Sequence, residues 1–159
     1  MNLLPDTSEL LSLEKKVGAE GTNLTPEDLI GCWQLQLTWS KLETKPKAFN
    51  SMLLRGLGAR LEINVKGDNL QINNSVNVGA LELRFSGRSQ LSKRKRQVLT
   101  FSFDELRFSF AKRLLFQQQL PMPAPGREPF FALIARNPSG WLAARGRGGG
   151  LALWTLQDK

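Results

Sequence analysis

Large apolar residues occupy every second position over 33–39, and this is the clearest pattern along the chain. These positions carry Trp33, Leu35, Leu37 and Trp39. The positions between them carry Gln34, Gln36 and Thr38. A period of two residues is typical of a β-strand with one buried side. We therefore predict a strand over 31–39 that buries both indoles on the same face.

Shorter runs of the same alternation recur along the rest of the chain, separated by turn residues. They predict strands that begin near Leu61, Leu70, Leu81, Leu99, Leu106, Phe130, Trp141 and Leu151. Start signals and leucines at helical spacing predict a helix over 5–17. Thr25 followed by Pro26 and two acidic residues predicts a second, brief helix.

Many short strands at regular spacing, with helices mainly at the start, indicate an all-β fold, either an antiparallel barrel or a sandwich. Gly31 and Trp33 form a Gly-x-Trp at the mouth of the first strand. Lipocalin-like barrels use such a motif to close one end, because the glycine permits a tight turn and the indole plugs the floor. We predict a single domain: residues 31–159 form a lipocalin-like antiparallel β-barrel, and residues 1–30 form a helical segment packed on it.

The alternation places an apolar, aromatic set inside such a barrel. The candidate pocket residues are Trp33, Leu35, Leu37, Trp39, Leu61, Ile63, Phe85, Phe101, Phe103, Phe108, Phe110 and Trp154, together with Phe49 and Leu53. They fit either a pocket for an isoprenoid or acyl chain or an ordinary core, since a small barrel can be filled by its own side chains. Phe49 and Leu53 belong to an amphipathic stretch over 49–57, which would cover the mouth as a lid or pack outside as a connecting helix.

Composition restricts the chemistry. The chain has no histidine, no tyrosine and one cysteine, so a Ser-His-Asp or Cys-His nucleophile, a Cys/His zinc site and a histidine-held haem are excluded. Asp104 and Glu105 are adjacent in a predicted strand, and adjacent strand positions point to opposite faces. We therefore expect no shared acid–base work from them, no catalytic residues, no metal and no required cofactor.

The positive charge is uneven. The net charge is +8, yet residues 1–50 carry five Lys and Arg against seven Asp and Glu. Lys93, Arg94, Lys95 and Arg96 form a basic hairpin tip, which is either a docking site for an anionic membrane or protein partner or simply a solvated turn. No nucleic-acid motif is present, and the phenylalanines follow core alternation, so nucleic acid is not expected. We also expect no signal peptide and no membrane span.

The order of these motifs resembles the plastid lipid-associated proteins, also called fibrillins or plastoglobulins. The strand motif Leu-x-Gly-x-Trp-x-Leu of that family is matched by Leu29, Gly31, Trp33 and Leu35. A phenylalanine-rich stretch over 100–110 and a proline-rich loop over 120–129 follow in the same order. The closing turn is matched by Arg145, Gly146, Gly149, Gly150, Leu151 and Leu153. The chain departs from the family at 141–144, where an acidic stretch is replaced by Trp-Leu-Ala-Ala.

The resemblance implies a lipocalin-like, non-catalytic protein that binds a lipid, carotenoid or quinone on the cytoplasmic side of a cyanobacterial thylakoid membrane. Two other classes remain open: a basic assembly partner of a photosynthetic or lipid-synthesis complex, and a calycin-type enzyme that attaches a chromophore. Gly31 and Trp33 would close the barrel. Arg145 and Arg147 are candidates to lay a guanidinium against Trp33 as a structural cation–π contact, the alternative being a contact with a ligand head group.

Overall fold

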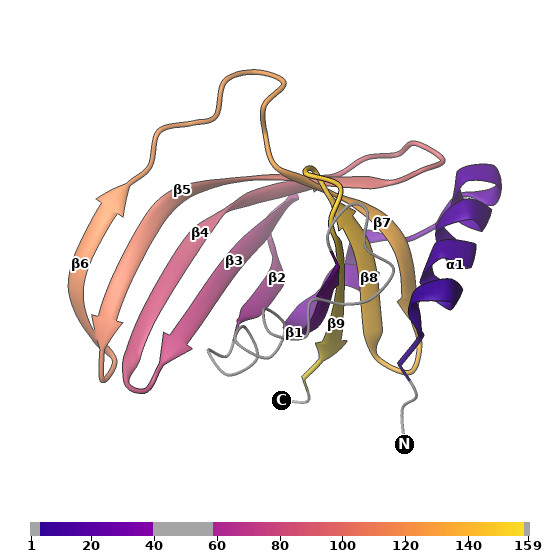
Figure 1. Ribbon diagram of the computed structural model, residues 1–159. Helices are drawn as coiled ribbons and strands as arrows, with labels where there is room; N and C mark the ends of the chain where they lie inside the picture. Colours follow the sequence, from indigo (N-terminus) through magenta and orange to yellow (C-terminus); the bar gives the residue numbers. More distant parts are fainter. Residues whose placement is uncertain (1–3, 40–58, 158–159) are drawn as a thin grey trace.

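The computed structural model describes residues 4–39 and 59–157. Its helices are α1 (Thr7–Glu20) and α2 (Pro26–Leu29). Its strands are β1 (Gly31–Trp39), β2 (Arg60–Lys66), β3 (Asn69–Val78), β4 (Leu81–Leu91), β5 (Val98–Phe110), β6 (Arg113–Gln119), β7 (Phe130–Asn137), β8 (Trp141–Gly146) and β9 (Leu151–Leu156). All pairings are antiparallel, in the order β4-β3-β2-β1-β9-β8-β7-β5-β6, and β5 pairs back onto β4. The strands thus close a ring, which confirms the predicted barrel-like all-β fold (Figure 1).

The ring is closed tightly at one end only. One edge of β5 pairs with β4 from Leu99 to Phe110. Its other edge pairs with β7 only over Val98–Thr100, and then with β6 over Glu105–Phe110. Beyond the β7 pairing, the sheet β3-β4-β5-β6 therefore fans away from the rest of the barrel, with β6 as its outermost strand (Figure 1).

The closed end holds the main core. Its buried members are Leu29, Trp33, Leu61, Ile63, Leu70, Ile72, Leu99, Phe101, Leu133, Leu142, Ala144 and Trp154. Leu35, Phe103 and Phe131 pack against this cluster. Leu29 belongs to α2, whose capping box joins Thr25 and Asp28. The capping box fixes the start of this short helix, and the helix in turn places the Leu29 side chain over the barrel floor.

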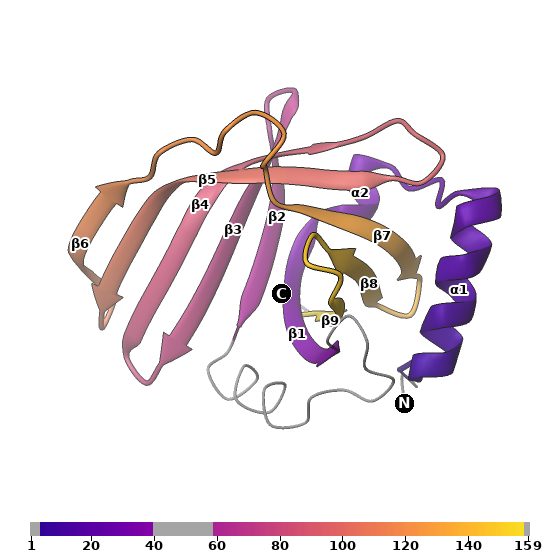
Figure 2. The same ribbon diagram turned by 45° about the horizontal axis from the view of Figure 1, so that its top comes forward.

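A second core lies on the outer face of β7, β8 and β9, beneath α1 (Figure 2). Its buried members are Leu10, Trp39, Ile134, Trp141, Ala143, Leu151 and Leu153, with Leu37 packed against them. The prediction that Leu37 and Trp39 share the inner face with Trp33 is wrong. The pairing of β1 with β9 shifts register between Leu35 and Leu37, and one extra residue in a strand turns all later side chains to the other face.

Polar contacts hold α1 on this outer face. The Asp6 carboxylate accepts the backbone N–H of Glu9 and forms a capping box that begins the helix. Trp39 Nε1 donates to Thr7 Oγ1 at 3.0 Å. Arg145, in β8, donates to both carboxylate oxygens of Glu14 at 2.6 and 2.7 Å. Bidentate contacts of this kind define the position of a helix as well as stabilising it.

Two sequence predictions differ from the observed elements. The stretches predicted near Leu99 and Leu106 are one continuous strand, β5. Strand β6 was not predicted, because its sequence Arg-Leu-Leu-Phe-Gln-Gln-Gln does not alternate and all of its residues are exposed. The amphipathic stretch over 49–57, with Phe49 and Leu53, lies outside the described residues.

Candidate functional site

An apolar sheet face continues from the closed end onto the fanned strands, where little covers it. We call it the open face, and it consists of Val76, Val78, Leu81, Leu83, Phe85, Leu106, Phe108, Phe110 and Phe116. Directly paired residues share a face, and the register joins these residues across β3, β4, β5 and β6. Phe110 is 50% exposed and Phe116 is 51% exposed. Large rings this accessible in contiguous positions are unusual for a soluble surface and indicate a binding site.

A row of aromatic rings links the open face to the core. Phe85 lies 5.6 Å from Phe103, and Phe103 lies 5.4 Å from Phe101, between ring centroids. Phe131 follows at 4.9 Å from Phe101, and Trp154 at 5.2 Å from Phe131. These separations suit tilted and edge-on ring packing. The row gives the open face a rigid inner wall, because its last members belong to the buried cluster.

The closed end is filled by protein side chains. Trp33 is fully buried, and its Nε1 donates to the Leu29 carbonyl at 2.9 Å. Gly31 has φ of +147°, a conformation that requires glycine, and a Cβ there would also push the end of the Leu156 side chain, 2.5 Å away, aside. Gly31 and Trp33 thus lie together at the floor of the barrel, where Trp33 is covered by Leu29.

The arginine at the floor is Arg136, and the prediction for Arg145 is wrong. The guanidinium carbon of Arg136 lies 5.0 Å from the Trp33 ring centroid, and its Nε donates to the Asp28 carbonyl at 3.0 Å. Arg145 binds Glu14 instead, and this contact raises the pKa of its guanidinium. Arg147 donates to the carbonyls of Glu128 and Gly126 and not to this site. Arg136 lies within β7 with no motif around it, so the sequence carried no signal for its contact with Trp33.

The predicted pocket residues therefore divide into separate places. Trp33, Leu35, Leu61, Ile63, Phe101, Phe103 and Trp154 belong to or pack on the buried cluster of the closed end. Phe85, Phe108 and Phe110 lie on the open face, where Phe116 of β6 adds exposed apolar surface. Leu114 is also exposed but lines the polar groove on the opposite face. Leu37 and Trp39 are in the outer core. The only sequence signal for the β6 residues was an unbroken apolar triplet.

The basic turn, Lys93 to Arg96, is exposed but anchored beside α1. Arg96 lies 3.8 Å from Glu14, and Thr22 N–H donates to the Lys95 carbonyl at 3.4 Å. Gln97, only 8% exposed, accepts the backbone N–H of Leu24 at 2.7 Å and donates to its carbonyl at 2.7 Å. The turn therefore belongs to the joint between the helical segment and the barrel, with part of its charge neutralised.

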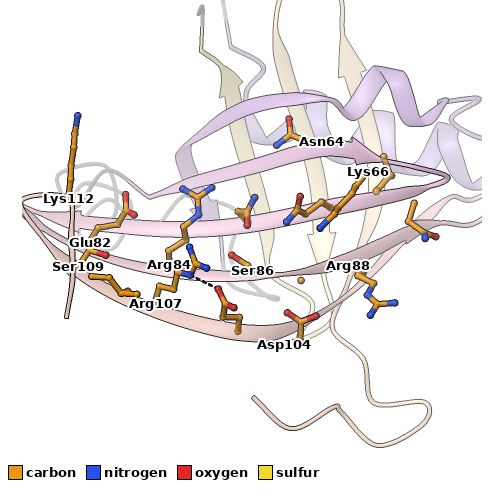
Figure 3. A pocket seen from close by; sticks show the side chains of 17 residues that line it. Asn64, Lys66, Glu82, Arg84, Ser86, Arg88, Asp104, Arg107, Ser109 and Lys112 are labelled. Carbon is orange, nitrogen blue, oxygen red and sulfur yellow. Dashed lines mark ion pairs between the residues drawn. The ribbon is translucent and has the colours of Figure 1, made fainter. Parts of the chain in front are cut away.

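A polar groove of about 980 Å³ follows the other face of the fanned strands (Figure 3). Its charged lining residues are Lys66, Glu82, Arg84, Arg88, Asp104, Glu105, Arg107 and Lys112. Arg84 pairs with Glu62 at 3.2 Å, and Arg107 pairs with Glu105 at 2.5 Å. One pair thus spans β3 to join β4 with β2, the other lies within β5, and the remaining charged side chains line the groove as a solvated outer surface would.

Asp104 and Glu105 both line this groove, so the prediction that they point to opposite faces is wrong. The register of β4 and β5 shifts where Ser86 faces Glu105 and Gly87 faces Phe103. Asp104 is the extra residue of this β-bulge, which breaks the alternation. Gly87 permits the close approach, because a Cβ there would lie 1.8 Å from the Ser102 carbonyl oxygen. Glu105 already accepts from Arg107 and from Gln117, which occupies its oxygens.

Within residues 4–39 and 59–157, no group of three or more acidic or cysteine side chains is arranged to hold a metal ion. No helix in the same ranges is long and apolar enough to cross a bilayer. Neither models of protein families nor curated proteins match this sequence.

Proposed function

We propose that this protein is a non-catalytic carrier or binder of an apolar chain, an acyl lipid or an isoprenoid such as a carotenoid or quinone, at a thylakoid membrane surface on the cytoplasmic side. The resemblance to the plastid lipid-associated proteins supports the ligand class and the location. We place the apolar chain of the ligand on the open face, since the closed end is filled by Trp33 and its neighbours.

The observation that carries the proposal is the incomplete burial of Phe108, Phe110 and Phe116. These rings continue the inner face of the barrel, yet the last two are about half exposed. Burying one aromatic ring under an acyl chain contributes roughly 1.5–3 kcal/mol. Three such contacts sum to about 4.5–9 kcal/mol before the cost of association is subtracted, so additional contacts of a long chain are needed for micromolar binding. Asn74, Gln118 and Arg113 pair with residues of this face and share it, but the apolar side chains outnumber them. This favours a long apolar ligand of variable identity over a compact polar one.

The test is binding in solution, without membranes. Phe108→Trp places a fluorescent reporter on the open face, and a short-tailed quinone or a brominated fatty acid serves as the quenching probe. We expect saturable quenching that exceeds quenching of the parent protein, whose Trp33 and Trp154 are buried. Phe110→Glu should weaken binding at least about tenfold, because the ligand then loses one ring and meets a charge.

The matched control is Leu11→Glu, which puts the same charge at an exposed apolar position, 41% accessible, on α1. This variant should bind as the parent does. The proposal fails if neither probe quenches saturably, or if Leu11→Glu and Phe110→Glu lose binding equally. Turnover of a bilin by the purified protein would instead favour the enzyme alternative.

A further inference from the structure

Two turns lie side by side at the free end of the fanned sheet (Figures 1 and 2). One joins β3 to β4, and the other joins β5 to β6. Ala111 N–H donates to the Ala80 carbonyl at 2.9 Å, which ties the two together. We call residues 78–81 and 110–116 the turn pair.

Exposed apolar side chains concentrate on the turn pair. Nine large apolar residues among the described ones are strongly exposed, and five of them lie here. They are Val78, Phe110, Leu114, Leu115 and Phe116, with exposures of 50 to 61%. Leu115 is the most exposed of the five and sits where the register of β5 and β6 shifts. Both faces of the hairpin therefore carry exposed apolar side chains. A sheet needs only one apolar face to form a core, so folding does not account for this arrangement.

Two cations stand among these apolar groups. Lys112 lies in the turn itself and Arg113 begins β6, and neither has an ion pair with any described residue. Ala111 and Lys112 have φ of 48° and 66°. Tight hairpin turns need such left-handed residues and normally use asparagine or glycine there. A lysine at this position is less favourable for folding, yet it places a positive charge at the very end of the hairpin.

We infer that the turn pair is the surface by which this protein contacts an anionic lipid bilayer. Apolar side chains enter the boundary between headgroups and acyl chains, and adjacent Lys and Arg side chains remain at the headgroup phosphates. The turn pair provides both, with Leu115 and Phe116 beside Lys112 and Arg113. The basic turn over 93–96 lacks the apolar part: among residues 4–39 and 59–157, no strongly exposed large apolar residue is its neighbour along the chain, and Arg96 is engaged by Glu14.

This inference rests on the proposed function and adds a path by which the ligand could pass from the bilayer to the open face. Phe110 belongs both to the turn pair and to the open face. From Phe110 the apolar positions continue through Phe108 to Phe85 and the aromatic row. A chain leaving the bilayer at the turn pair would thus meet apolar surface along its whole path. A protein partner would need a complementary acidic and apolar surface, and it is an alternative outcome of the test.

Flotation with vesicles tests the inference. Vesicles of phosphatidylcholine with phosphatidylglycerol are compared with vesicles of phosphatidylcholine alone, each at low and physiological salt. We expect binding to the anionic vesicles that weakens with salt. Lys112→Gln with Arg113→Gln should lower the partition coefficient about thirtyfold, since each cation near an anionic surface contributes about fivefold. Leu115→Asp should lower it similarly without disturbing a buried contact.

The matched control is Lys93→Gln with Arg94→Gln, which removes the same charge from the basic turn and should float nearly as the parent does. Equal losses in the two double variants, or no flotation of the parent protein, would overturn the inference. Equal binding to neutral and anionic vesicles would also overturn it, because non-specific adsorption of an apolar protein-docking surface gives that result. The quenching assay separates the two proposals, because Lys112→Gln with Arg113→Gln should still bind the quinone in solution. Loss of flotation by Leu115→Asp with unchanged quenching isolates the membrane contact.

Discussion

Trp33→Ala should open a cavity at the floor of the barrel and destabilise the protein strongly. The indole is fully buried, and burying a tryptophan removes about 200 Å² from water, worth about 5 kcal/mol. A compact unfolded chain reduces this to roughly 3–5 kcal/mol, which matches the usual loss for large aromatic truncations. For a domain of this size each kcal/mol lowers the Tm by about 2–4 °C, so the Tm should fall by roughly 6–20 °C.

The assay is urea unfolding followed by circular dichroism and by the fluorescence of the remaining tryptophans. Trp33→Phe keeps most of the apolar area but leaves the Leu29 carbonyl without its donor, so it should lose about 1–3 kcal/mol. Leu11→Ala, on the exposed side of α1, should change stability by less than about 0.5 kcal/mol. A loss below about 1 kcal/mol for Trp33→Ala would refute the role of this indole as the plug of the barrel.

Three further substitutions test the β-bulge at Gly87, the contact between Arg145 and Glu14, and the capping box of α1. Gly87→Ala should lower stability by about 1–3 kcal/mol in urea unfolding, because the new methyl would overlap the Ser102 carbonyl oxygen and force the bulge apart; no loss would mean that the bulge shifts freely. Arg145→Lys should cost about 1–2 kcal/mol, since lysine cannot bind both Glu14 oxygens, and an unchanged midpoint would count against this joint. The Glu9 backbone N–H holds the pKa of the Asp6 carboxyl below its ordinary 3.8. The carboxylate therefore stabilises the folded state above that pH, and this stabilisation is lost as the pH falls through the lower folded pKa. In Asp6→Asn the free energy of unfolding should depend less on pH in this acid range, and an unchanged pH dependence would contradict the assignment.

The conformation of each segment followed closely from local pattern. Alternation predicted the strands that became β1, β2, β7, β8 and β9. Start signals predicted both helices, although α1 continues to Glu20, past the predicted end. The Gly-x-Trp motif predicted closure of one end, and Gly31 and Trp33 do lie at the floor. Such features depend on a few neighbouring residues, so the sequence alone carries them.

The faces of those strands depended on tertiary structure. The bulges after Leu35 and at Asp104 invert the alternation, and a bulge is defined only against the partner strand. For this reason Trp39 belongs to the outer core, and Asp104 lies in the same groove as Glu105.

Long-range partners and exposure were likewise decided by the fold. Composition alone determined that the chain has no histidine chemistry and an excess of positive charge. The sequence could not tell that Arg136 would face Trp33 while Arg145 paired with Glu14, since these partners lie more than a hundred positions apart. Nor could the sequence tell that β5 continues well beyond its three-residue pairing with β7 and leaves Phe110 half exposed. Which apolar residues become core and which stay exposed depends on where the ring of strands ends, and that is a property of strand pairing across the whole chain.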